Sequence, residues 1–248
     1  MAKNEELLMK GNCLERMKEI ETDSVDMALV DPPYETTSCK WDKIIDLSLM
    51  WEQLSRIVKL NGSIAIMASQ PFTSKLIMSN PDWFRYCWYW EKERLTNIAQ
   101  VKKRPGKTIE EICVFYKKQP TYNPQMVKHN GPKRTNKVKN GKMGELTDIN
   151  QKNVKEYNDT GYRYPTQVLK FQRDTLKLNL HPTQKPLALM EYLIKTYTNE
   201  NDSVIDFAMG SGTTGVACVN LNRQFIGIEL DENYFNIAKE RIENAKSE

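Results

Sequence analysis

The chain has 248 residues, of which 40% are hydrophobic and 27% charged, and its formal net charge is +4. No apolar run approaches the roughly 18 residues that a membrane-spanning helix needs, and the first residues do not have the pattern of a signal peptide. The five cysteines are scattered without a Cys-x-x-Cys pair, and there are only two histidines. These counts argue against a disulfide framework and a metal centre, and they predict a globular protein of the reducing cytoplasm.

The first chemically distinctive stretch lies where a short buried strand is expected to end. Residues 11–17 indicate a turn that opens a short helix, and residues 25–30 indicate the strand. The strand is followed by Asp31, Pro32, Pro33 and Tyr34. Two prolines stiffen the backbone and leave their carbonyls free, and the carboxyl ends of parallel strands are where such sheets bind ligands. These four residues suit a clamp for a planar amine such as a nucleobase, and a simple strand-ending turn is the alternative.

The next segments alternate between helix and strand. Apolar residues at helical spacing predict a helix over residues 42–59, ended by Asn61 and Gly62. Residues 63–68 form an apolar run of strand type, and Pro71 fits the first turn of a following helix. This order is typical of a parallel sheet with crossover helices.

Two further strands are predicted, and a basic turn connects them. Residues 83–90 are dense in aromatic side chains, and residues 110–116 are mainly apolar. The turn at residues 102–107 contains Lys103 and Arg104, which could contact phosphate, although a solvated loop would have the same composition.

Residues 119–180 differ from the rest in composition. From residue 120 to residue 180 the chain carries twelve basic residues and five acidic ones, so this third-sized block is strongly positive on a mildly acidic body. Such a distribution predicts an insertion that meets a polyanion. The basic residues that we expect to contact it are Lys133, Arg134, Lys137, Lys139 and Arg163.

The helical pattern returns after Pro186, and a glycine-rich unit closes the chain. A strand is expected at residues 203–208, a tight turn at 210–215, and a second strand at 225–229 that ends in Glu229. Strand, glycine turn, helix and acid-terminated strand form a nucleotide-binding unit, in which the acid accepts hydrogen bonds from ribose hydroxyls. A nicotinamide-dependent oxidoreductase is one interpretation, but this unit closes the chain instead of opening it. A glycine turn used only for packing is another.

Three motifs in this order resemble the exocyclic-amino DNA methyltransferases, the N6-adenine and N4-cytosine family. In chain order they are residues 31–34, residues 181–186 (His-Pro-Thr-Gln-Lys-Pro) and residues 206–214, and the likeness spans the whole chain. The clamp-first order resembles the circularly permuted β class, of phage or restriction-associated type. The resemblance implies a Rossmann-like α/β fold with a mostly parallel sheet and helices on both faces. Residues 1–118 and 181–248 would form the catalytic domain, and residues 119–180 a target-recognition insertion.

The resemblance also implies a cofactor, S-adenosylmethionine, and a set of residues that bind it. Glu229 would bind the ribose, Thr183 and Lys185 the carboxylate, and Asn12 and Cys13 would lie near the adenine ring. The remaining pocket residues would be Asp206, Ala208, Gly210, Ser211, Gly212 and Thr213. The family often has aspartate where Asn12 stands and phenylalanine where Ala208 stands.

The clamp chemistry implied by the family is methyl transfer to a flipped-out base in double-stranded DNA. An acid at Asp31 accompanies adenine in this family, whereas serine there accompanies cytosine, so N6-adenine is the expected target and N4-cytosine the alternative. RNA and a non-catalytic DNA-binding subunit are further alternatives. A cognate restriction enzyme and a homodimer are possible partners, and no membrane partner is expected.

Overall fold

A computed structural model describes residues 6–34, 45–129, 131, 159–173 and 184–247, and the structural statements below concern these residues. They fall into two compact units. The described residues up to Asn123 and from Thr166 onward form the larger unit, and Pro124–Pro165 form the smaller one. No helix in the described part of the chain is long and apolar enough to cross a membrane.

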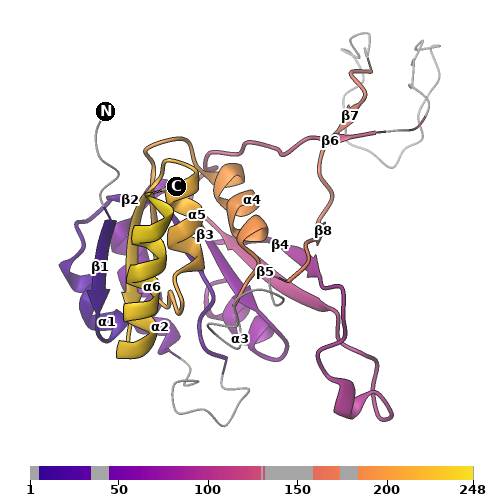
Figure 1. The fold of residues 1–248 in the computed structure, drawn as a ribbon, viewed down its shortest axis with the longest axis horizontal. Coiled ribbons are helices and arrows are strands. Elements are labelled where there is room, and N and C mark those ends of the chain that lie inside the picture. Colours follow the sequence, from indigo (N-terminus) through magenta and orange to yellow (C-terminus); the bar gives the residue numbers. More distant parts are fainter. Residues whose placement is uncertain (1–5, 35–44, 130, 132–158, 174–183, 248) are drawn as a thin grey trace. The chain divides into compact units, whose positions relative to one another are not determined.

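The larger unit is built on one eight-stranded sheet (Figure 1). In sheet order the strands are β1 (Glu6–Lys10), β10 (Gln224–Glu229), β9 (Ser203–Asp206), β2 (Val25–Val30), β3 (Val58–Ala68), β5 (Ile109–Phe115), β4 (Phe84–Glu91) and β8 (Val168–Lys170). The first five strands are parallel to one another. The strand β5 is antiparallel to both β3 and β4, and β8 is parallel to β4. The predicted mostly parallel α/β sheet is therefore confirmed.

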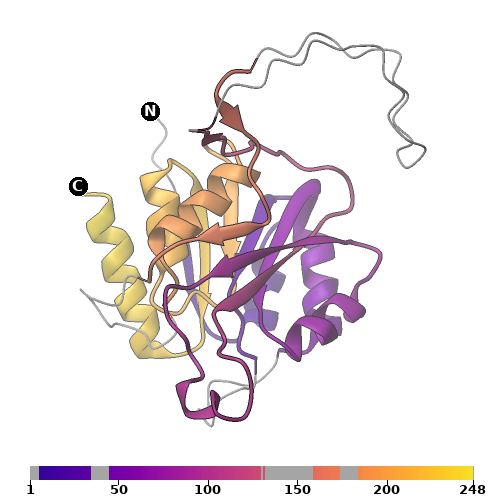
Figure 2. The same cartoon turned by 90° about the vertical axis from the view of Figure 1, so that its right-hand side faces the viewer.

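Helices cover both faces of this sheet, as predicted (Figure 2). One face packs against α1 (Cys13–Arg16), the 3-10 helix η1 (Met17–Glu19), α2 (Leu47–Ile57) and α3 (Phe72–Ser79). The other face packs against α4 (Leu187–Tyr197), α5 (Thr213–Asn220) and α6 (Glu232–Ala245). The central strand β2 is buried from both sides because Ala28 and Val30 face the first layer and Met27 and Leu29 the second.

Local sequence explains the helix starts that position these layers. The Asp46 carboxylate accepts the Leu49 N–H at 3.0 Å and caps α2. Asp231 caps α6 in the same way, as its sequence position predicts, by accepting the N–H groups of Asn233 and Tyr234.

One helix boundary differs from the prediction. The helix expected over residues 42–59 ends at Ile57, and Asn61 and Gly62 lie inside β3, which begins at Val58. Val58 pairs with Val25, and the register then shifts before Met27 pairs with Ser63, so tertiary pairing overrides the turn signal of Asn-Gly. The structure also adds β1, which the sequence pattern did not indicate.

The smaller compact unit, Pro124–Pro165, spans fewer residues than the insertion predicted at 119–180. Leu169 in β8 is buried and pairs with Trp90 at the edge of the main sheet, so this segment belongs to the larger unit. Asn123 also belongs to it, since the Asn123 side chain donates to the carbonyls of Lys195 and Thr198 at the end of α4. The smaller unit contains a two-stranded antiparallel ladder of β6 (Val127–Lys128) and β7 (Tyr162–Arg163).

A further short element of the larger unit, the 3-10 helix η2 (Ile98–Gln100), lies in the loop between β4 and β5.

Candidate active site at the carboxyl edge of the sheet

The two sequence motifs separated by some 180 residues meet at one edge of the sheet. Asp31 directly follows β2, and β2 pairs in parallel with β9 through Met27–Val204 and Ala28–Ile205. The glycine turn begins just after β9. Because parallel neighbours end at the same edge, the expectation that Asp31 and the glycine turn lie at adjacent strand ends is confirmed.

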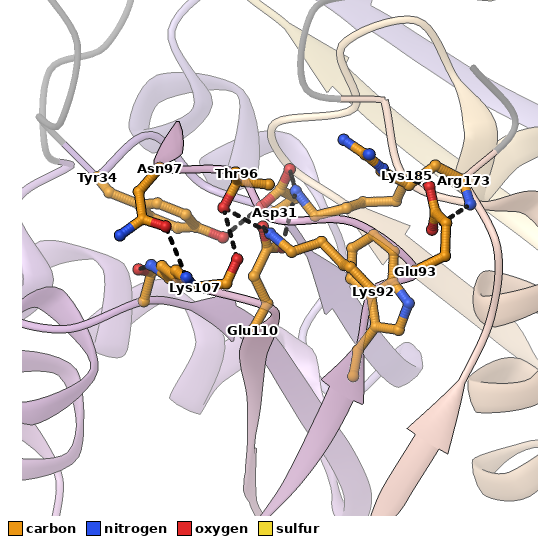
Figure 3. Close-up of polar contacts among 12 residues, drawn as sticks. Asp31, Tyr34, Lys92, Glu93, Thr96, Asn97, Lys107, Glu110, Arg173 and Lys185 are labelled. Carbon is orange, nitrogen blue, oxygen red and sulfur yellow. Dashed lines mark hydrogen bonds and ion pairs between the residues drawn. The ribbon is translucent and has the colours of Figure 1, made fainter. Parts of the chain in front are cut away.

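The clamp residues contact one another closely. The Tyr34 hydroxyl donates to Asp31 Oδ1 at 2.5 Å (Figure 3). The Tyr34 ring lies 5.2 Å from the Phe72 ring, centroid to centroid, with an interplanar angle of 28°. Burial, and then the neighbouring Asp31 charge, raise the pKa of Tyr34 well above its usual value. Tyr34 is therefore a hydrogen-bond donor whose ring has one face against α3.

Lys185 forms an ion pair with the second oxygen of the Asp31 carboxylate. Its ammonium pairs with Asp31 Oδ2 and lies 3.7 Å from Glu110 Oε2, and its side chain is 8% exposed. Burial alone would lower the pKa of Lys185, but Asp31 and Glu110 outweigh it and raise that pKa. In the structure, Lys185 thus bridges the clamp and β5.

A second buried ion pair continues from this bridge. Lys92, after β4, donates to Glu110 Oε1 at 2.7 Å, and its side chain is 3% exposed. Burial would raise the pKa of Glu110, yet Lys185 and Lys92 lower it, while burial lowers the pKa of Lys92. Neither Lys92 nor Glu110 is among the site residues predicted from the sequence. The available signal was an acid at the start of a strand whose other residues are mainly apolar.

The glycine turn needs its glycines for conformational reasons. Gly210 and Gly212 have φ values of 51° and 79°, in the left-handed region that favours glycine. A Cβ at Gly212 would lie 2.8 Å from the Ala238 Cβ, so α6 leaves no room for a side chain there. The left-handed backbone thus favours glycine at both positions, and at Gly212 the contact with α6 requires it as well.

The Asp206 carboxylate stabilises the glycine turn through two hydrogen bonds. The Asp206 carboxylate accepts the Thr214 hydroxyl at 2.6 Å and the Ala208 N–H at 3.1 Å. Burial raises the pKa of Asp206 to about 7, and the charges of Asp31 and Glu229 act in the same direction. Ser211 and Thr213 lie at the start of α5 and both contact Arg241, whose guanidinium is 3.0 Å from the Ser211 hydroxyl.

Glu229 joins the last strand to the turn and to the N-terminal strand. Its two carboxylate oxygens accept the N–H groups of Gly210 at 2.9 Å and Asp231 at 2.8 Å. The Glu229 carbonyl accepts the N–H of Gly11, which places the following Asn12 and Cys13 beside the end of β10. The Asn12 side chain caps α1 through the Leu14 N–H, and burial raises the pKa of Cys13 to about 11.

The charges at this edge suit a cationic ligand. Asp31, Asp206 and Glu229 end three neighbouring strands, and the first and last of them raise the pKa of the carboxyl between them. S-adenosylmethionine carries a sulfonium and an ammonium group, so its binding would offset this negative charge. The glycine backbone and the carboxylates therefore fit the cofactor that the motifs predict.

The similarity to known proteins agrees with this geometry. Residues 25–240 match the family model described as DNA methylase. The chain belongs to this family. The methylase is 30% identical to DNA adenine methyltransferase YhdJ of Escherichia coli (strain K12), over 96% of this chain and 83% of the relative. It is 28% identical to type II methyltransferase M.HpaI of Haemophilus parainfluenzae, over 96% of this chain and 74% of the relative.

Solved structures share the fold of this methylase. The crystal structure of the M1.HpyAVI–SAM complex matches with a TM-score of 0.64 and 27% identity, and covers 96% of this chain and 99% of that one. PvuII DNA methyltransferase (cytosine-N4-specific) matches with a TM-score of 0.67 and 16% identity, over 97% of this chain and 90% of that one. The second match concerns the fold alone.

The basic residues expected to contact DNA are distributed over both units of the methylase. Lys103 and Arg104 are exposed in the loop between β4 and β5. Arg163 lies in the smaller unit, where its guanidinium makes two hydrogen bonds of 2.7 and 2.8 Å to the Asp159 carboxylate. Five of the predicted site residues lie outside the described residues: Lys133, Arg134, Lys137, Lys139 and Thr183.

Proposed function

We propose that this methylase transfers a methyl group from S-adenosylmethionine to the exocyclic N6 amine of adenine in double-stranded DNA. The observation that carries the proposal is the position of Asp31 at the end of β2, beside the glycine turn that follows β9. This arrangement would hold an amine and a methyl donor at adjacent strand ends. Holding two reactants in line supplies a large part of the rate gain of such a transfer.

The chain's own residues would hold the cofactor from three strands. Glu229 would accept from the ribose, with Asn12 and Cys13 near the adenine ring, and the backbone at Gly210 and Gly212 would allow close approach. Asp206 and Ala208 would shape the turn behind it, together with Ser211 and Thr213. When bound, S-adenosylmethionine supplies an electrophilic methyl group. Thr183 and Lys185 would meet the cofactor carboxylate, for which Lys185 would have to leave Asp31.

The clamp would activate the amine through hydrogen bonds. An exocyclic amine is a poor nucleophile because its lone pair is delocalised into the ring. Donation of its two N–H groups to the Asp31 carboxylate and the Pro32 carbonyl would draw the nitrogen toward tetrahedral geometry and free the lone pair. Pro33 keeps this backbone stiff. Tyr34 would stack on the base, which must leave the duplex because its amine is paired there.

Methyl transfer can be measured with labelled cofactor and unmethylated genomic DNA. We expect label in N6-methyladenine when the DNA is digested to nucleosides. Label in N4-methylcytosine would favour the alternative target, and no label in DNA of varied sequence would contradict the proposed function. Asp31→Ala should abolish transfer while calorimetry still detects cofactor binding. Asp82→Ala, which removes an exposed acid in the turn before β4, is the matched control and should retain activity.

The preference for adenine rests on the acid at the first clamp position. The relative YhdJ is a DNA adenine methyltransferase by name, which supports the same target. Residues 119–180, with the compact unit Pro124–Pro165 inside them, would read the DNA sequence. Their positive charge and that of Lys103 and Arg104 would attract the phosphate backbone.

The cellular setting forms part of the proposal. The type II methyltransferase relatives support a cognate restriction enzyme, which a nuclease assay on unmethylated DNA with lysate of the source cells would detect. A homodimer is proposed as well, and sedimentation of the purified chain tests it. A reducing cytoplasm is proposed as the compartment, on the ground that the five cysteines are scattered without a Cys-x-x-Cys pair.

A further inference from the structure

The loop between β4 and β5 projects from the sheet edge that carries the clamp. The strand β5 is antiparallel to β3 and to β4, so β4 ends at the same edge as β2 and β3. Residues 92–108 therefore extend beyond the clamp edge, which Figures 1 and 2 show as a long hairpin loop below the sheet. Whatever molecule approaches the clamp meets this loop as well.

The root of the loop is fixed to the clamp region. The Lys107 ammonium donates to the Ser69 hydroxyl, and Ser69 directly follows β3. On the other side of the loop, Lys92 pairs with Glu110, which lies next to Lys185 (Figure 3). These contacts set the direction in which the loop leaves the sheet.

The tip of the loop is ordered by its own hydrogen bonds. The Asn97 side chain donates to the Pro105 carbonyl at 3.0 Å and accepts the Lys107 N–H at 2.6 Å, which clasps the two sides together. The Gln100 carbonyl accepts the N–H groups of Lys103 and Arg104 at 2.9 and 3.1 Å. The η2 turn is thus presented in a set conformation, which lowers the entropy cost of binding.

The surface of the tip combines apolar and basic side chains. Ile98 is 71% exposed, Val101 42% and Leu95 40%. Residues 94–107 contain five bases and no acid. Exposed apolar side chains surrounded by positive charge suit a partner that offers both phosphates and a hydrophobic base stack.

We propose that this loop is a DNA wedge. Ile98 enters the base stack beside the target nucleotide, while Lys102, Lys103 and Arg104 contact the flanking phosphates. Apolar wedges of this kind separate base steps, and extruding a base is costly because stacking and pairing are lost. The wedge rests on the proposed function in one respect, since it assigns to Ile98 the task of lowering the cost of extruding the target base.

The activity test compares two duplexes that contain the methylated site, once sequencing of the modified DNA has located it. In one the target base is paired normally, and in the other it faces an abasic position, where extrusion is easier. Ile98→Ala should lower kcat/KM about 10- to 100-fold on the paired duplex and much less on the abasic one. Met78→Ala, which truncates a side chain 72% exposed at the end of α3, should change neither value. Equal losses on both duplexes, or no loss on either, would overturn the proposal.

A binding test does not depend on methyl transfer. In Ile98→Trp the new indole should be quenched when the chain binds duplex DNA, because stacked bases quench indole fluorescence, whereas in Met78→Trp the fluorescence should stay unchanged. Absence of quenching in a bound Ile98→Trp complex would contradict the wedge alone. Absence of any methyl transfer by the unchanged chain would contradict the proposed function alone. Self-association through the tip is the competing use of this surface. Loss of self-association in Ile98→Ala, with methyl transfer on the paired duplex unchanged, would also overturn the wedge.

Discussion

Both oxygens of the Asp31 carboxylate are already engaged by the chain, one by the Tyr34 hydroxyl and the other by the Lys185 ammonium. An incoming amine can displace one of these two donors or share the carboxylate with them, since each oxygen can accept more than one hydrogen bond. The Tyr34 hydroxyl is bonded to Asp31, while the Tyr34 ring is the part expected to stack on the base. Ring and hydroxyl therefore have separable roles.

Substitutions at Tyr34 can separate these roles. Tyr34→Phe should retain kcat/KM within about threefold, because the ring remains and the lost hydrogen bond is one that the amine replaces. Tyr34→Ala should lose about 10- to 100-fold, the range expected from the roughly 1–3 kcal/mol of base–aromatic stacking. Steady-state kinetics on the mapped site measures both. If Tyr34→Phe lowered kcat/KM as much as Tyr34→Ala, the contribution of Tyr34 to catalysis would come from its hydroxyl and not from its ring.

The buried Asp206 makes stability depend on pH. Its pKa is about 7 in the folded chain, above the ordinary value of 3.8, so the folded state holds the proton more tightly than the unfolded state. The stability that this proton contributes is fully present below pH about 4 and is lost as pH rises through about 7.

Asp206→Asn should remove this dependence, because the amide keeps an acceptor for the turn and does not ionise. Between pH 5 and pH 8 the unchanged chain should lose about 2–3 kcal/mol of unfolding free energy relative to the variant. Urea denaturation at the two pH values gives the difference. Parallel pH profiles of the two proteins would contradict the pKa of about 7.

At the scale of elements, one carboxylate links β5 to two lysines from other parts of the chain. The Glu110 carboxylate forms ion pairs with Lys92, which follows β4, and with Lys185, which precedes α4. Removing one partner of a buried ion pair leaves the others in a low-dielectric site without compensation. The start of β5 is therefore a point where stability and clamp geometry are coupled.

Glu110→Gln should destabilise the chain by about 2–4 kcal/mol, because two buried ammonium groups lose a counter-charge. Glu232→Gln is the matched control, since Glu232 makes a 2.8 Å pair with Lys10 but its side chain is 72% exposed. The control should change stability by less than about 1 kcal/mol. Denaturant midpoints compare the stabilities of the two variants. Equal destabilisation by Glu110→Gln and Glu232→Gln would contradict a stabilising role of Glu110 in the buried ion pairs.

Features of the site that depend on neighbouring residues could be predicted from the sequence, whereas contacts between distant residues could not. The strand before Asp31 and the cap at Asp231 could be predicted because periodicity and capping act within a few residues. The Lys185 contact with Asp31 could not, because it joins residues 154 apart in sequence, one in a loop and one after a strand. The end of α2 was misplaced at Asn61 because strand pairing of Val58, a tertiary effect, decided it.

At the scale of the whole molecule, positive charge should govern association with DNA. Each phosphate neutralised by a base releases counterion, so the logarithm of affinity should fall linearly with the logarithm of salt concentration, by roughly 0.9 per contact. A flat affinity between low and moderate salt would contradict a phosphate-based interface.

Two exposed bases can be removed to measure their share. The double variant Lys103→Ala and Arg104→Ala should reduce the salt slope by about 1–2. The double variant Lys75→Ala and Lys239→Ala removes the same charge from α3 and α6, which cover the sheet faces, and should leave the slope near that of the unchanged chain. Fluorescence anisotropy across a salt series measures all three. Equal slopes in the two double variants would indicate that net charge alone, and not the β4–β5 loop, attracts the DNA.

The pairing of β1 with β10 has a consequence for biosynthesis. Within the described part of the chain, Glu6–Lys10 pair with one strand, Phe225–Glu229, which is translated more than 200 residues later. On the ribosome, β1 must therefore wait for more than 200 further residues before it finds its neighbour. The Gly11 contact with Glu229, which brings Asn12 and Cys13 to the site, forms at the same late moment. A nascent chain would thus lack the Gly11 contact, and with it this placement of Asn12 and Cys13, until β10 has been synthesised.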